Sequence, residues 1–122
     1  MEIDFLNPEQ IINMGGPYVG ILNINKEPIC ENVIIDNYII KDNLIYFIVY
    51  NDESKWARDN YFSIFYYDNI KKKLFEIQKK FQAIFLKKFV NEDSIKIYKA
   101  FHDTFENHFI VDISKTPHKE VF

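Results

Sequence analysis

The sequence predicts an all-β protein: an antiparallel β-meander of about eight short strands that forms a sandwich or a barrel. Short runs rich in Ile, Val, Tyr and Phe recur about every ten residues, and these residue types fit a pleated surface. Asp-Asn pairs stand next to several of these runs, and both residue types favour turns. The 122 residues are 48% apolar and 17% aromatic. A chain of this size and composition is expected to form one hydrophobic core, so we expect a single domain over residues 1–122.

The first element that the sequence predicts is a short N-terminal helix. Asn7 is a good N-cap, Pro8 suits the first helical position, and Gln10 stands where a capping box has its third helical residue. An apolar side is supplied by Ile11, Ile12 and Met14. Gly15–Pro17 then ends the helix, because Gly favours a helix C-terminus and Pro cannot continue it.

Eight strands are then expected from the apolar runs. Asp42-Asn43 lies directly between two of them and predicts a tight hairpin, and Asn91–Asp93 predicts a second one. In Leu44–Tyr50 and Phe62–Tyr67 both alternating sets of side chains are apolar, which indicates central strands covered on two faces. The expected strands are Tyr18–Ile24, Val33–Lys41, Leu44–Tyr50, Tyr61–Tyr67, Leu74–Gln78, Ala83–Phe89, Ile95–Phe101 and Phe109–Ile113.

Residues 69–89 also allow a different interpretation. Ile70, Leu74, Ile77 and Phe81 recur at helical spacing, and the segment is rich in good helix formers. An α+β fold with a helix around 69–89 is therefore the alternative. The dense Ile and aromatic content near Ala83 favours two strands instead.

Composition excludes several classes of protein. A single cysteine, Cys30, cannot form an internal disulfide, and the longest apolar run, Leu44–Tyr50, is far shorter than the ~20 residues of a membrane span. Glu2 and Asp4 stand at the start, and no Lys or Arg precedes Lys26, so we expect no signal peptide. These features favour a cytoplasmic protein.

Catalytic and metal-binding motifs are not apparent. His102-Asp103 could act as a base with its orienting acid, but no nucleophile elbow accompanies the pair. Cys30, His102, His108 and His118 lack the close spacing that zinc sites use. We therefore expect no enzyme activity, no metal and no cofactor, and interpret His102 as a histidine at the end of a strand.

Charge is divided unevenly along the chain. Residues 1–60 hold ten acids and four bases, a net charge of −6, whereas residues 61–122 hold eleven bases and eight acids, a net charge of +3. Lysines alternate with phenylalanines between residues 71 and 89, a pattern that single-stranded nucleic acids can use. However, the pI is about 5.6 and Arg58 is the only arginine, which argues against nucleic-acid binding.

The segment 51–60 is the most distinctive part of the sequence. It is longer than an ordinary hairpin loop and holds the only tryptophan and the only arginine, two residue types enriched in binding hot spots. Together with neighbouring acids it predicts a protein-binding surface. The predicted partner-binding residues are Asp52, Glu53, Trp56, Arg58 and Asp59 within the segment, and Asp42, Asp36 and Glu31 outside it.

In length, acidity, aromatic strands, lack of a catalytic motif and the acidic 52–59 loop, the chain resembles the small bacterial immunity proteins of contact-dependent inhibition and related polymorphic toxin systems. The resemblance implies an antitoxin that binds a cognate toxin domain, often a nuclease, and covers its active site. An acidic inhibitor would complement the cationic surface that a nuclease needs. The alternative is a small-ligand-binding β-barrel whose cavity is lined by Tyr46, Tyr50, Tyr61 and Tyr67.

Overall fold

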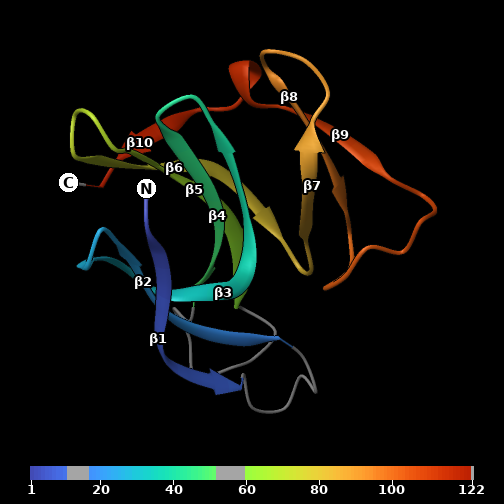
Figure 1. Ribbon diagram of the computed structural model, residues 1–122. Coiled ribbons are helices and arrows are strands. Elements are labelled where there is room, and N and C mark those ends of the chain that lie inside the picture. Colours follow the sequence, from blue (N-terminus) through green and yellow to red (C-terminus); the bar gives the residue numbers. More distant parts are fainter. Residues whose placement is uncertain (11–16, 52–59, 122) are drawn as a thin grey trace.

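The computed structural model describes residues 1–10, 17–51 and 60–121, and these residues form two antiparallel β-sheets (Figure 1). The large sheet has the strand order β1-β2-β3-β4-β5-β6-β10, and the small sheet has the order β7-β8-β9. The predicted all-β meander is confirmed, because strands β1 to β6 pair consecutively. The chain then crosses to the small sheet and returns so that β10 pairs with β6.

The bounds of the expected strands lie within three residues of those observed, except that the strand expected at Val33–Lys41 begins six residues earlier, at Glu27. Two strands, β1 and β10, were not expected from the sequence. The large sheet comprises β1 Ile3–Gln10, β2 Tyr18–Ile24, β3 Glu27–Lys41, β4 Leu44–Asn51, β5 Tyr61–Asp68, β6 Lys73–Phe81 and β10 His118–Glu120; the small sheet comprises β7 Phe85–Phe89, β8 Ser94–Tyr98 and β9 Phe109–Asp112, followed by the short 3-10 helix η2 Ile113–Lys115.

Strands β4 and β5 are the centre of the fold, as their two apolar faces predict. One face of β4, including Ile48, packs in a core with Leu86 and Ile97 of the small sheet. The other face, including Ile45, packs in a second core with Leu22 of β2. The molecule therefore has two cores, one on each side of a shared central layer.

The second core exists because β3 bends sharply. Asn32 and Asp36 have positive φ values of 57° and 61°, and the pairing with β4 jumps from Val33 opposite Val49 to Tyr38 opposite Phe47. Such irregularities bend a strand and increase its twist. Figure 1 shows β3 crossing the lower part of the molecule and then turning upward beside β4. The first half of β3, with β1 and β2, thereby covers one face of the central layer.

Tight turns join several pairs of neighbouring strands in the described part of the chain. The predicted hairpin at Asp42-Asn43 is confirmed: Lys41 pairs with Leu44, and Asp42 has a φ of 57°. The predicted hairpin at Asn91–Asp93 is also confirmed, because β7 and β8 pair on either side of it. Asparagine and aspartate accept these positive φ values more readily than most residues.

The expected N-terminal helix is wrong. Asn7, the predicted N-cap, has a φ of 52° and lies within β1, not at the start of a helix. It forms a bulge with Pro8, because Leu6 pairs with Ile21 and the next pair is Glu9 with Val19. A strand at the edge of a sheet tolerates a proline, which cannot donate a backbone hydrogen bond. The remainder of the expected helix falls on residues 11–16, outside the described part.

The segment 69–89 forms strands β6 and β7, so the helical alternative is wrong. Leu74 faces the core shared with β2, whereas Ile77 faces the core shared with the small sheet. These two side chains thus lie on opposite faces of β6. Ile70 is 75% exposed in the turn before β6. Although Ile70, Leu74 and Ile77 have helical spacing in the sequence, they do not share one buried face in the structure.

Candidate functional site

The predicted partner-binding residues fall into two groups in the structure. Asp52, Glu53, Trp56, Arg58 and Asp59 lie in the segment 52–59, outside the described residues. Glu31, Asp36 and Asp42 are described, and all three are exposed on β3 or in the turn that follows it. Of the predicted partner-binding residues, the structure therefore places only Glu31, Asp36 and Asp42.

Asp36 lines a groove between β1 and β3. The groove has a volume of about 270 Å³, and a second carboxylate, that of Asp4, also lines it. The bend in β3 positions Asp36, whose φ of 61° belongs to the left-handed region that aspartate tolerates. The other lining residues are apolar or aromatic: Ile3, Phe5, Pro8, Ile35 and Tyr38.

The aromatic wall of this acidic groove is anchored in the core. The ring centroids of Phe5 and Tyr38 are 6.1 Å apart. Both side chains are partly buried and pack against the core between β2 and β4. The two carboxylates therefore lie beside apolar groups that the core holds in place, an arrangement suited to a protein contact.

A glycine allows the strands around the groove to approach closely. A Cβ atom at Gly20 of β2 would lie 2.8 Å from the carbonyl oxygen of Leu6 and 3.4 Å from Cγ2 of Ile35. The first distance is too short for a carbon atom next to backbone. Only glycine fits between β1 and the bend of β3 without displacing one of them.

The carboxylates of the groove keep their negative charge exposed. Within the described ranges, neither Asp4 nor Asp36 has a lysine or arginine at ion-pair distance. By contrast, Asp103 contacts Lys87 at 2.6 Å. An unpaired pair of carboxylates leaves a local negative potential that can attract a basic partner.

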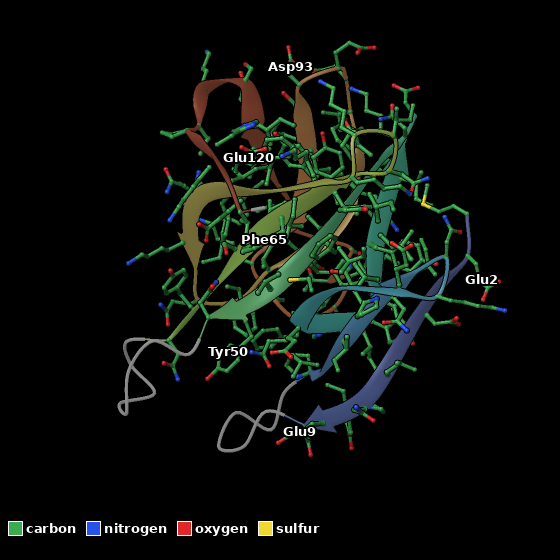
Figure 2. The ribbon with its side chains drawn as sticks, turned by 90° about the vertical axis from the view of Figure 1, so that its left-hand side faces the viewer. Glu2, Glu9, Tyr50, Phe65, Asp93 and Glu120 are labelled. Carbon is green, nitrogen blue, oxygen red and sulfur yellow. The ribbon has the colours of Figure 1, made fainter. Side chains whose placement is uncertain are left out.

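Glu31 and Asp42 do not join Asp36 in this groove. Asp42 lies in the turn that precedes β4, whereas the segment 52–59 follows the other end of β4. Eight strand residues at ~3.3 Å each separate the two ends by about 26 Å. Figure 2 shows Tyr50 and Glu9 at one end of the molecule and Asp93 at the other. Of the three predicted acids that the structure describes, only Asp36 lines the groove.

Asp4 is the functional candidate that the sequence analysis did not assign. Its signal was present in the alternation of Ile3, Asp4 and Phe5, which is typical of a half-exposed strand. The capping pattern beginning at Asn7 directed the interpretation toward a helix instead. Asp4 and Asp36 are far apart in sequence, but they line the same groove beside the bend of β3.

The acid of the possible catalytic pair, Asp103, is engaged in other contacts. The carboxylate of Asp103 accepts hydrogen bonds from Lys87, from the backbone of Phe105 and from Tyr98. These contacts, that with Lys87 above all, lower the pKa of Asp103. His102 is exposed. The contacts of Asp103 therefore orient the loop between β8 and β9, and not the imidazole ring of His102.

The single cysteine is an unreactive thiol. Burial, together with the neighbouring charge of Glu31, raises the pKa of Cys30 to about 12, so the reactive thiolate is scarce at neutral pH.

In the part of the chain that the structure covers, no three His, Cys, Asp or Glu side chains gather in a way that could hold a metal ion. A search of the same residues finds no helix of sufficient length and apolarity to cross a membrane.

The tyrosines proposed to line a ligand cavity do not share one. Tyr46 packs in the core beside the small sheet, and Tyr67 packs in the core beside β2. Both are almost fully buried, and the central layer separates them. A single internal cavity lined by all four tyrosines is therefore incompatible with this fold.

Comparison with known proteins gives no relative: no family model, no curated protein and no solved structure matches the chain.

Proposed function

We propose that this chain is an immunity protein, a non-catalytic inhibitor that binds the active-site surface of a cognate toxin domain, and that the toxin is a basic nuclease. The observation that carries the proposal is the groove that Asp4 and Asp36 both line, together with the aromatic residues Phe5 and Tyr38. The acidic 52–59 segment supplies a second set of candidate contacts.

Complementary charge is the physical basis of this proposal. A nuclease presents Lys and Arg to the phosphates of its substrate, and an acidic inhibitor competes for the same groups. Opposite potentials accelerate association, and contacts with apolar side chains such as Phe5 and Tyr38 slow dissociation. Neither effect requires a bond to be made or broken by this protein.

Charge reversal in the groove tests the proposal. A pull-down from the source cells, or the gene next to this one, supplies the toxin, and association and dissociation rates are then measured by surface plasmon resonance. For the double variant Asp4→Lys/Asp36→Lys we expect association at least about tenfold slower, because steering becomes repulsion. The same assay on Trp56→Ala examines the 52–59 segment.

The matched control is Asp93→Lys/Glu106→Lys. It changes the net charge by the same amount as the groove variant, but at exposed residues in the connections of the small sheet. We expect this control to bind as the parent does. Equal rates for the parent and the groove variant would exclude the groove as the contact surface, provided that circular dichroism shows both to be folded. A toxin that stays active in the saturated complex would contradict inhibition itself.

A further inference from the structure

Three concavities adjoin one another where the chain passes from the large sheet to the small one. The central concavity has a volume of about 300 Å³ and is lined by Lys79, Lys80, Phe81, Gln82, Ala83 and Lys99. It shares Lys79 and Lys80 with one neighbour and Lys99 with the other. In Figure 1 the connection from β6 to β7 lies close to the end of β8.

An irregularity in β6 directs two of the lysines outward. Ile64 pairs with Ile77 and Phe62 pairs with Phe81, so three residues of β6 stand opposite Ser63 alone. Bulges of this kind alter the direction of side chains. Here the bulge contains Lys79 and Lys80. Lys99 reaches the same cavity from the residue after β8, next to the pair that Tyr98 makes with Phe85.

Each of these lysines is held over an aromatic ring. The ammonium nitrogen lies 4.5 Å from the ring centroid of Tyr61 for Lys80, 5.7 Å from that of Phe81 for Lys79, and 4.2 Å from that of Phe109 for Lys99. A cation–π contact restrains the side chain but does not cancel its charge.

In the described part of the chain, none of these three ammonium groups lies at ion-pair distance from a carboxylate. Among the residues that the structure describes, the lysines in ion pairs are Lys41, Lys73, Lys87 and Lys115. Three lysines that form no ion pair with a described residue therefore line one concavity. Such a cluster attracts an anion that can accept several charge-assisted hydrogen bonds at once.

The neighbouring concavities limit the size of the ligand. Glu76 lines the concavity on one side and Glu106 lines the one on the other side. Both carboxylates would repel a polyanion that extended beyond the central concavity. A compact anion avoids them, and a volume of about 300 Å³ is at the lower end of the range for small-molecule sites.

We propose that this cavity binds a small phosphorylated compound, with its phosphate between Lys79, Lys80 and Lys99 and its body against Ala83 and the edge of Phe81. Lysine suits this role because its ammonium group acts as a point charge toward phosphate oxygens. The site is formed by the end of β6, the connection from β6 to β7 and the residue after β8. It shares no lining residue with the acidic groove, so it does not depend on the proposed immunity function.

The test is a titration of the ¹⁵N-labelled full chain with ribose 5-phosphate and with inorganic pyrophosphate, followed by NMR. We expect saturable shifts of amides in residues 79–83 and 99–100. Lys80→Gln and Lys99→Gln should each weaken binding about tenfold, because one charge-assisted hydrogen bond is lost. Lys119→Gln, on the exposed strand β10, is the matched control and should bind as the parent does.

Three results would overturn the proposal. The first is that neither compound gives saturable shifts at the cavity, and the second is equal affinity in the parent and in Lys99→Gln. The third is tighter binding of an oligothymidylate than of ribose 5-phosphate, with shifts that extend past Glu76 or Glu106, which would identify a nucleic-acid surface instead. The ¹⁵N spectrum of each variant shows directly whether it is folded.

Discussion

At the scale of single residues, the side chain of Asn37 connects the two sheets by hydrogen bonds to the backbone of Leu86. Its side-chain nitrogen donates a hydrogen bond to the carbonyl oxygen of Leu86 at 3.0 Å, and its side-chain oxygen accepts one from the amide of Leu86 at 3.0 Å. Asn37 is only 7% exposed. The buried backbone of β7 thus has partners on the side that faces β3, and unpaired groups there would be unfavourable.

We expect Asn37→Ala to lower the free energy of unfolding by about 3 kcal/mol, because it leaves a buried amide and a buried carbonyl of Leu86 without partners. Urea unfolding followed by circular dichroism measures the loss. Asn91→Ala is the comparison: Asn91 accepts a single bond from the amide of Asp93 in an exposed turn, so its loss should stay under about 1 kcal/mol. Equal losses for the two variants would contradict the bridging role of Asn37.

Asn37 also shows where single-residue prediction from sequence stops. The pair Asp36-Asn37 has the composition of a turn, and Asp36 does adopt a positive φ at the bend of β3. Nothing local distinguishes an asparagine in an exposed turn from one whose amide reaches a strand 49 residues later. That contact depends on the position of the small sheet, which local residue pattern does not specify.

At the scale of elements, Asp68 holds two neighbouring turns together. One of its carboxylate oxygens accepts hydrogen bonds from the amides of Ile70 and Lys71, both at 3.0 Å, and from the side chain of Asn43 at 2.7 Å. The bond from the Lys71 amide contributes most to lowering the pKa of Asp68. Burial opposes the shift, and the bonds from Ile70 and Asn43 add to it.

This lowered pKa gives a pH-dependent stability. A carboxyl group whose pKa is lower in the folded state stabilises the fold fully above the unfolded pKa of about 3.9, and this stabilisation is lost as the pH falls through the folded pKa. We expect Asp68→Asn to be about 1 kcal/mol less stable than the parent at pH 7, since neutral hydrogen bonds replace charged ones. The difference should shrink below pH 3.9, as parallel urea titrations of both proteins will show. A difference that is constant with pH would exclude the charge of Asp68 as its cause.

The strand β6 illustrates why local pattern was ambiguous for this segment. Ile70, Leu74, Ile77 and Phe81 have the spacing of a helix face, yet in the structure the first is exposed and the next two enter different cores. A strand buried on both faces has apolar residues at odd and even positions, and some of these fall at helical intervals by chance. The bulge at Lys79 and Lys80 adds a further departure from strict alternation.

At the scale of the whole molecule, the sequence was most informative where burial is complete. The two-faced apolar pattern of Leu44–Tyr50 identified β4 as central, because no other environment accepts apolar side chains on both faces. The edge strands β1 and β10 were missed, since their mostly exposed residues carry little hydrophobic pattern. The acidic groove was not predicted, for the same reason: Asp36 was among the expected partner-binding acids, but Asp4, which lines the groove with it, lies on an edge strand that local pattern did not reveal.

The shared central layer should make the two cores unfold as one unit. Ile45 and Ile48 lie on the same strand, are fully buried, and face different cores. Replacing either with Ala removes the same atoms and should lower the free energy of unfolding by about 3–4 kcal/mol.

Because β4 belongs to both cores, we expect hydrogen exchange of the most protected amides in β2 and in β8 to accelerate equally in either variant. Ile40→Ala, 50% exposed on the same hairpin, is the control and should change exchange little. If Ile48→Ala accelerated exchange in β8 but left β2 protected, the layers would be separate folding units and the central layer would not couple them.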